Sequence, residues 1–242
     1  MKLPFVKKNR KHHSHDISDK ELVTKNPDAS LTEALKVVRT NLMYTLSENE
    51  GGKAVLITSA FSAEGKTSTC INLAATLAMT EAKVLLIDAD LRKPRVHTYL
   101  EVKNTEGLAN HLGGFAKIDS IIKRMTKYNF DYITAGNIPP NPAELLASKK
   151  FERFIAEVQE KYDYIIFDTP PVNAVSDALS IVKHINNVVF ICRCGISTTS
   201  EVKKAISALE FAQAKILGFI TIAPQNKKRD YYDSYSGYYY YR

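Results

Sequence analysis

The sequence predicts an α/β fold in which a mostly parallel sheet is covered by helices on both faces. Short continuous runs of Val, Ile and Leu alternate with segments of helical periodicity, which is typical of strands buried on both sides. The first of these strands runs into a glycine-containing loop that opens a helix. With 242 residues, 45% of them apolar, the chain is long enough to bury one full-sized core of this kind.

Composition divides the chain into a central domain and two tails. Residues 1–28 lack a hydrophobic period and are predicted to be a basic disordered tail, while 29–225 form the domain. Residues 226–242 are predicted to be a flexible, tyrosine-rich tail. The domain should begin with a helix at Ser30, which is a candidate N-cap with Glu33 as its capping-box partner.

Strands and helices then alternate along the domain. Ligands of such sheets bind at the carboxyl ends of the strands. The expected strands are Ala54 to Ser59, Lys83 to Asp88, Tyr132 to Thr134, Tyr164 to Asp168, Asn187 to Arg193 and Ile216 to Ile222. The expected helices are Gly65 to Thr80, Ala143 to Lys161, Asp177 to His184 and Thr199 to Gln213.

The formal net charge of +7 is concentrated near the start of the chain, where residues 1–25 carry seven Lys or Arg and three acids. This excess favours an anionic partner or a membrane surface, and a solvated tail is the alternative. No basic stripe interleaved with aromatic residues predicts nucleic-acid binding. No apolar run approaches the ~20 residues of a membrane-spanning helix, and no secretory signal is recognisable, so a cytoplasmic location is expected.

A phosphate-binding loop is predicted between the first strand and the following helix. Gly65, Lys66 and Thr67 match the last three positions of G-x-x-x-x-G-K-[ST], and Ala60 replaces the first glycine. In such a loop the backbone N–H groups and the helix N-terminus stabilise phosphate, the lysine reaches the β- and γ-phosphates, and the threonine hydroxyl binds Mg²⁺. The predicted nucleotide-binding residues are Ser62, Ala63, Glu64, Gly65, Lys66, Thr67 and Ser68.

Two other strands end in carboxylates. Asp168 ends one strand and suits the Walker-B role of holding Mg²⁺ or its waters. Asp88 ends another, and Asp90 would share its face if that strand continued. One of the pair could then orient metal-bound water while the other accepts a hydroxyl proton. A salt bridge from Asp90 to Arg92 or Lys93 is the alternative.

These motifs together resemble the bacterial tyrosine kinases of the P-loop NTPase fold, which serve capsule and exopolysaccharide synthesis. The resemblance rests on the phosphate loop, on the Asp88 and Asp90 pair with its nearby arginine, and on the Asp168-Thr169-Pro170-Pro171 stretch. It extends to residues 136–146, Gly-Asn-Ile-Pro-Pro-Asn-Pro-Ala-Glu-Leu-Leu, and to a terminal tyrosine cluster. The clustered tyrosines are Tyr231, Tyr232, Tyr235, Tyr238, Tyr239, Tyr240 and Tyr241.

The resemblance implies an ATP- and Mg²⁺-dependent kinase that phosphorylates this tyrosine cluster in trans. Lys66, Asp88 and Asp90 would be catalytic, with Asp88 as the base. Thr67, Asp88 and Asp168 would surround the metal, with Asp90 helping to organise it. The family usually has Pro-Gly in the loop where this chain has Ser62 and Ala63.

The resemblance also implies partners. The family's E-x-x-R-x-x-R oligomerisation pattern corresponds to Glu33, Lys36 and Arg39, with lysine in the middle, and implies a ring-shaped homo-oligomer. An ordinary i, i+3 ion pair is the alternative. A transmembrane activator of the polysaccharide chain-length type would recruit the chain to the inner face of the membrane. A cognate phosphotyrosine phosphatase and further protein substrates are also implied.

A partition or positioning ATPase is the alternative function, since such proteins share the fold and the aspartates but use ATP as a conformational switch. Their loop carries an additional lysine in the pattern K-G-G-x-G-K-T. Phe61 occupies that position here, which favours the kinase.

Overall fold

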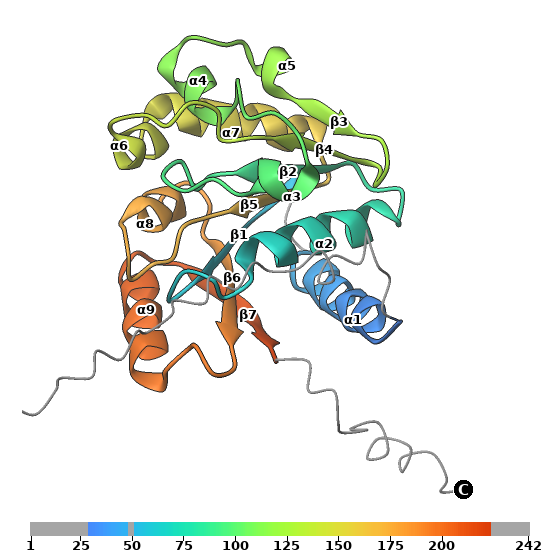
Figure 1. Cartoon of the computed structure of the whole chain (residues 1–242), viewed down its shortest axis with the longest axis vertical. Helices are drawn as coiled ribbons and strands as arrows, with labels where there is room; N and C mark the ends of the chain where they lie inside the picture. The colour runs from blue at the N-terminus through green and yellow to red at the C-terminus, as the bar shows by residue number, and fades with distance from the viewer. Residues whose placement is uncertain (1–28, 48–50, 224–242) are drawn as a thin grey trace, which may run out of the picture.

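The computed structural model describes residues 29–47 and 51–223, which form one sheet of seven strands covered by helices (Figure 1). The strand order is β3-β4-β2-β5-β1-β6-β7. Every strand pair is parallel except β3 with β4, so the predicted mostly parallel sheet is confirmed. The strands are β1 (Lys53–Ser59), β2 (Val84–Asp88), β3 (Lys123–Met125), β4 (Phe130–Ile133), β5 (Tyr164–Asp168), β6 (Asn187–Arg193) and β7 (Lys215–Ile222).

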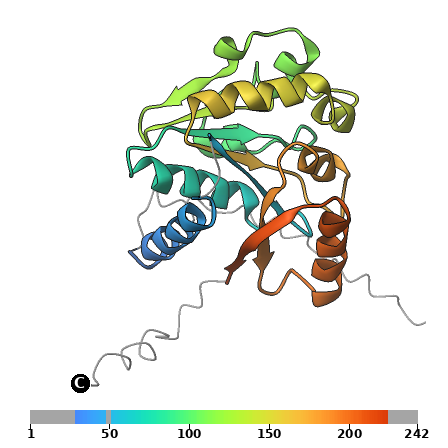
Figure 2. The ribbon, with the colours of Figure 1, turned by 180° about the vertical axis from the view of Figure 1, so that it is seen from behind.

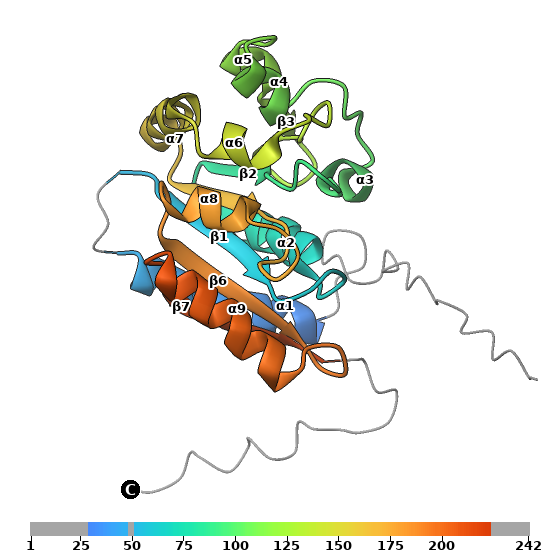
Figure 3. The same ribbon diagram turned by 90° about the vertical axis from the view of Figure 1, so that its left-hand side faces the viewer.

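Helices cover both faces of the sheet, as predicted. One core lies between the sheet and α1, α2 and α3, and the other lies under the remaining helices. Figure 2 shows the molecule from the side of α7 and α9, and Figure 3 shows it turned by 90°. The helices are α1 (Ala29–Thr45), α2 (Lys66–Ala78), α3 (Val96–Leu100), α4 (Leu108–Gly113), α5 (Ile118–Ile121), α6 (Pro142–Leu146), α7 (Lys149–Lys161), α8 (Asp177–Val182) and α9 (Thr199–Phe211).

The sheet brings the carboxyl ends of its central strands to one edge. β1 lies between β5 and β6, and β5 also pairs with β2. The register aligns Asp88 at the end of β2 directly with Asp168 at the end of β5. Because the chain leaves β1 at the same edge and enters α2, the predicted phosphate loop and two predicted carboxylates meet there.

Three local predictions are corrected. Ser30 lies inside α1, which already includes Ala29, so it is not the N-cap. The helix predicted over Ala143 to Lys161 is two helices, because Ser148 leaves the helical conformation and its hydroxyl caps α7 by accepting a hydrogen bond from the Phe151 N–H at 3.2 Å. The short strand β3 was not predicted, since its residues are mostly exposed and carry no apolar alternation.

The two predicted tails, including all seven clustered tyrosines, lie outside the described residues. No helix in the ranges 29–47 and 51–223 is both long enough and apolar enough to cross a membrane.

Candidate active site

The phosphate loop joins β1 to α2 and needs a glycine at its last position. Gly65 has φ of 90°, and a Cβ there would lie 2.5 Å from the Ile222 Cδ1 atom at the end of β7. Any other residue would therefore meet backbone strain and would also have to displace the tip of the Ile222 side chain. Ala63 also has a positive φ, of 65°, at one of the two positions where this chain departs from Pro-Gly. The loop thus keeps its turn with only one glycine.

Lys66 and Thr67 begin α2 and both face the carboxyl edge of the sheet. The Lys66 ammonium donates to the Ser59 hydroxyl at 3.1 Å and to the Phe61 carbonyl at 3.3 Å. The Thr67 hydroxyl donates to Asp168 Oδ2 at 2.6 Å. A phosphate-binding lysine and a metal-binding hydroxyl are therefore held within one short segment, and the hydroxyl is already coupled to the predicted Walker-B carboxylate.

Glu64 and Ser68, two predicted nucleotide-binding residues, are buried and support the loop from within. Glu64 accepts a hydrogen bond from the Phe61 N–H at 2.6 Å and another from the Ser197 hydroxyl. The Ser68 hydroxyl donates to the Gly65 carbonyl at 3.0 Å. These side chains fix the shape of the loop, whereas Ser62, Ala63, Gly65, Lys66 and Thr67 line a cavity.

Asp88 is completely buried behind the site. Strand β2 ends at this residue, so the shared strand face expected for Asp88 and Asp90 does not form. Instead the chain turns, and Asp88 accepts hydrogen bonds from the N–H groups of Asp90 at 3.3 Å, Arg95 at 3.1 Å and Val96 at 3.0 Å. The carboxylate therefore organises the loop that follows β2.

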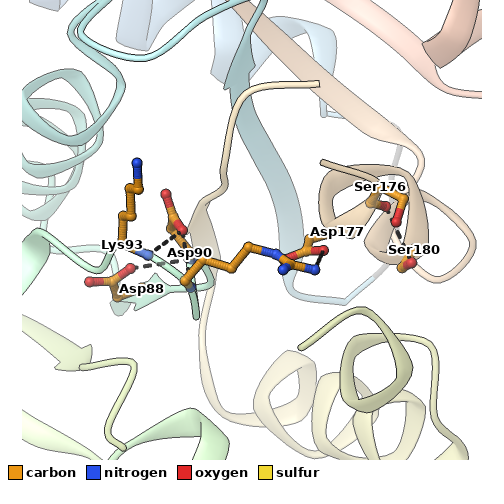
Figure 4. A network of polar contacts seen from close by, with 7 residues as sticks. Asp88, Asp90, Lys93, Ser176, Asp177 and Ser180 are labelled. Atoms are coloured by element: carbon orange, nitrogen blue, oxygen red, sulfur yellow. Dashed lines mark hydrogen bonds and ion pairs between the residues drawn. The ribbon is translucent and has the colours of Figure 1, made fainter. Parts of the chain in front are cut away.

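Asp90 lies in front of Asp88 and lines the cavity. Its Oδ1 atom accepts hydrogen bonds from the N–H groups of Arg92 at 3.2 Å and Lys93 at 2.9 Å (Figure 4). The alternative salt bridge from Asp90 to Arg92 is not formed. The Arg92 guanidinium instead binds both carboxylate oxygens of the buried Asp177, at 2.8 and 3.0 Å.

The buried carboxylates at the strand ends have perturbed pKa values. Burial raises the pKa of Asp88 well above its ordinary value, and the neighbouring charge of Asp168 raises it further. Burial also raises the pKa of Asp168, to about 6, against the opposing effects of the Thr67 hydrogen bond and the Lys66 charge. In addition, Asp168 Oδ1 is buried and has no hydrogen-bond partner among the described residues. Such an orphaned acceptor beside Thr67 suits a cation.

A cavity of about 630 Å³ joins these groups. Its volume is in the range of small-molecule sites. The phosphate loop and Asp168 at the end of β5 form part of its wall, and the loops after β2 and β5 and helix α3 form the rest. Asp88, at the end of β2, does not line the cavity. The lining residues beyond the phosphate loop are Asp90, Arg92, Lys93, Arg95, Thr98, Tyr99, Asp168, Pro170, Pro171, Ala174 and Val175.

The predicted oligomerisation residues lie on α1 and do not line this cavity. Glu33 and Lys36 form an exposed i, i+3 ion pair of 2.6 Å, the alternative considered for them. The Arg39 guanidinium donates to the Thr76 carbonyl of α2 at 3.0 Å, so part of it is engaged within the subunit.

Comparison with known proteins identifies the family. A family model described as an AAA domain matches residues 52–217. The putative tyrosine-protein kinase CapB of Staphylococcus aureus is 38% identical over 210 residues, which cover 86% of this chain and 92% of CapB. The chain belongs to the bacterial tyrosine kinase family. The solved kinase domain of the Escherichia coli tyrosine kinase ETK superposes with a TM-score of 0.81 at 35% identity, over 86% of this chain and 82% of that domain.

Two further comparisons show how much of a longer family member this chain spans and how similar it is to a protein of another kind. Tyrosine-protein kinase wzc of Salmonella typhi is 35% identical over 91% of this chain, but the chain spans only 30% of wzc. The septum site-determining protein MinD of Pyrococcus horikoshii, solved with Mg-ADP, is more distant, with a TM-score of 0.60 at 25% identity. The ETK kinase domain is thus more similar to this chain than the septum site-determining protein MinD is. The chain is a tyrosine-protein kinase with the P-loop NTPase fold.

Several residues of the site were not predicted from the sequence. Ser59, which accepts a hydrogen bond from Lys66, directly precedes the phosphate loop, but no position of the loop pattern marks it. Asp177, which pairs with Arg92, lies far from that residue in the sequence. Asp177 could be recognised in the sequence only as an acid in the first turn of a helix. Lys93 and Arg95 follow the Asp88 and Asp90 pair, but no family motif marked them as part of the site.

Proposed function

We propose that this kinase binds Mg-ATP in the cavity of about 630 Å³ and transfers the γ-phosphate to tyrosine hydroxyls. The observation that carries the proposal is the convergence of Lys66, Thr67 and Asp168, held together by the hydrogen bond from Thr67 to Asp168 of 2.6 Å. A lysine at a helix N-terminus, a hydroxyl and a carboxylate with one unpartnered oxygen are the groups that a phosphate chain and its metal require.

The nucleotide phosphates fit the phosphate loop. Gly65 leaves the backbone open, and the N-terminus of α2 directs its free N–H groups and its positive end toward the loop. Lys66, which rests against Ser59 and Phe61, can exchange these neutral acceptors for phosphate oxygens, which are stronger partners. We expect the triphosphate to lie along Ser62 to Thr67.

The protein groups present also fit Mg²⁺. The Thr67 hydroxyl and the Asp168 carboxylate, with its unpartnered Oδ1, would hold it directly or through water. Within the described ranges no group of three His, Cys, Asp or Glu forms a protein cage for a metal. Mg²⁺ commonly takes one or two protein ligands and completes its shell with phosphate and water. When bound, the metal would neutralise charge developing on the transferred phosphoryl group.

Asp88 is the proposed base. Its raised pKa makes its ionised form a better proton acceptor than an ordinary carboxylate. Asp90, which lines the cavity and donates its N–H to Asp88, would organise the metal waters and the approach of the acceptor hydroxyl. Since phosphoryl transfer passes through a loose transition state, Lys66 and charge neutralisation should supply more of the rate than proton removal does.

The tyrosine cluster of residues 231–241 is the proposed acceptor, modified in trans within a homo-oligomer. Seven tyrosines among Asp, Ser and Gly lack the apolar period of a packed segment, so their hydroxyls should be accessible to another subunit. A ring that contacts through Glu33, Lys36 and Arg39 would bring such segments to neighbouring cavities. A cognate phosphatase would reset them, and other proteins would also be substrates.

A separate transmembrane activator is the proposed partner. The wzc protein of Salmonella typhi carries about 70% of its length outside the region matched by this chain, so a related kinase region is joined there to much additional sequence. We propose that a partner provides the corresponding part here and recruits the kinase from the cytoplasm to the inner face of the membrane. The setting would be control of capsular or exopolysaccharide synthesis and export.

The deciding experiment is incubation of the purified chain with Mg-ATP, alone and with the cytosolic segment of a candidate activator, followed by phosphotyrosine mapping. The control is Lys66→Met, which removes the phosphate-binding charge but keeps a long side chain. We expect phosphate on residues 231–241 in the unsubstituted chain only. Hydrolysis of ATP without phosphotyrosine, even with the activator, would instead support the switch ATPase.

A further inference from the structure

Three basic residues line the cavity beyond the phosphate loop. Arg92, Lys93 and Arg95 all come from the loop between β2 and α3, and all are exposed at its surface. The established parts of a nucleotide site, Lys66 and the N-terminus of α2, lie on a different segment. The cavity therefore has a second source of positive charge, on a segment separate from the phosphate loop.

The two proposed catalytic aspartates hold the backbone that bears these cations. Asp90 accepts from the N–H groups of Arg92 and Lys93, at 3.2 and 2.9 Å. Asp88 accepts from the N–H of Arg95 at 3.1 Å. Figure 4 shows Asp88, Asp90 and Lys93 gathered at this turn. The position of the basic loop is thus fixed relative to the groups that would receive the acceptor hydroxyl.

Only part of this charge is neutralised by the protein. Arg92 is committed to the buried Asp177, which binds it through two hydrogen bonds. Lys93 and Arg95 make no ion pair with any other residue in the ranges 29–47 and 51–223. Two uncompensated cations therefore stand at the cavity beside Asp90, in a site otherwise rich in carboxylates.

We infer that Lys93 and Arg95 select acceptor tyrosines that have acidic side chains close by in the sequence. The inference rests on the proposed kinase function and adds the class of substrate. An aspartate one to three residues from the acceptor tyrosine would contact these cations while the tyrosine hydroxyl lies near Asp90, in front of Asp88. A tyrosine flanked by basic residues would meet repulsion instead.

The chain's own tyrosine cluster is divided by this criterion. Asp230 and Asp233 flank Tyr231 and Tyr232 directly, whereas Lys228 and Arg229 lie further away on the N-terminal side. Asp233 precedes Tyr235 by two residues, and no basic residue lies that close to Tyr235. The run Tyr238 to Tyr241 contains no acid and is followed by Arg242. Tyr231, Tyr232 and Tyr235 are therefore the favoured first acceptors. Once they are phosphorylated, their own charge of about −1.5 to −2 each would supply acidic neighbours for later steps.

The expected effect is moderate, since exposed ion pairs contribute about 0.2–1 kcal/mol each. Loss of one pair should raise KM for an acidic peptide about 1.4- to 5-fold, and loss of both about 2- to 30-fold. The effect should shrink as ionic strength rises, because exposed charges are screened.

The test uses the full-length kinase, with its activator segment if activity requires it, and two peptides of residues 230–237. One peptide has the natural sequence, and in the other both aspartates are replaced by asparagine. We expect the natural kinase to prefer the acidic peptide and Lys93→Ala/Arg95→Ala to lose that preference, while KM for ATP stays constant. Lys203→Ala, which removes an exposed lysine of α9, is the matched control and should keep the preference.

Equal KM values for the two peptides with the natural kinase would overturn the inference. So would a rise in KM for ATP in the double variant without any loss of peptide preference, since these cations would then serve the nucleotide. Phosphorylation of the neutral peptide in either case leaves the kinase function intact. In a time course on the chain itself, earlier modification of Tyr238 to Tyr241 than of Tyr231 and Tyr232 would also contradict the inference.

Discussion

At the scale of single residues, the site depends on two carboxyl groups buried at adjacent strand ends. Asp88 and Asp168 face each other across the β2 and β5 register, and both have raised pKa values because burial disfavours their charged forms. When folding raises the pKa of a carboxyl group, the ionised form of that group destabilises the folded state. The nucleotide-free enzyme should therefore be less stable than its core alone would allow.

Asp168→Asn should stabilise the nucleotide-free protein while abolishing kinase activity. Asparagine keeps an acceptor for the Thr67 hydroxyl but removes the buried charge. The folded pKa of about 6 lies above the ordinary 3.8, so the penalty is present above pH 6 and vanishes as pH falls toward 3.8. Urea denaturation should show a gain of roughly 3 kcal/mol at pH 7.5 and little gain near pH 4. An equal gain in the free energy of unfolding at both pH values would mean that removal of the Asp168 charge is not the cause of the stabilisation.

Asp88→Asn should reduce phosphoryl transfer much more than ATP binding. An asparagine oxygen can still accept from the Arg95 and Val96 N–H groups, so the loop should persist. Loss of the base should lower kcat by about 10²-fold or more, within the range of general-base effects. Fluorescence titration with a labelled ATP analogue should show a Kd within about threefold of the unsubstituted chain, with Asp90→Asn measured in parallel. If activity and binding fell equally, the base assignment would fail.

At the scale of elements, the phosphate loop is supported by segments that come much later in the chain, the β6–α9 connection and the end of β7. Buried Glu64 joins the loop to Ser197 in the β6–α9 connection, and Gly65 packs against Ile222 at the end of β7. The loop is therefore shaped by two later strands as well as by its own sequence.

Glu64→Ala should weaken both the fold and nucleotide binding. It leaves the buried Phe61 N–H without its acceptor at 2.6 Å, which costs about 1–3 kcal/mol. A loosened loop must also be ordered on binding, so KM for ATP should rise about tenfold. Glu64→Gln, which keeps an acceptor for Phe61, is the matched control and should stay close to the unsubstituted chain in thermal unfolding and ATP titration. Equal behaviour of the two variants would show that the acceptor does not matter.

Most elements of the fold could be predicted because their signals are local. The strands Tyr164–Asp168 and Asn187–Arg193 were predicted with the observed bounds, since each is a continuous apolar run between polar residues. The break at Ser148 was missed because the apolar period continues across it. The pairing of Arg92 with Asp177 could not be predicted, because it depends on how two loops meet after the sheet has formed.

At the scale of the whole molecule, the proposed acceptor segment and the proposed oligomer surface are separate from the catalytic cavity. The Glu33 and Lys36 pair is exposed on α1, where it is available to exchange partners with a neighbouring subunit. The chain carries a formal net charge of +7. A modification that adds many negative charges will therefore change the electrostatic interaction between subunits.

Phosphorylation of the tyrosine cluster should loosen the oligomer. Seven phosphotyrosines, at about −1.5 to −2 charges each, would change the formal charge from +7 to about −4 to −7. That charge would be concentrated in a segment that must approach a neighbour's Asp88, Asp90 and Asp168, so repulsion should replace productive contact. Light scattering after incubation with Mg-ATP should show a fall in mass. A variant with all seven tyrosines replaced by phenylalanine should keep its mass under the same conditions. An unchanged mass after complete phosphorylation would exclude dissociation of the oligomer by charge repulsion. The ring would then have to be held by contacts, such as those on α1, that the charge on residues 231–241 does not affect.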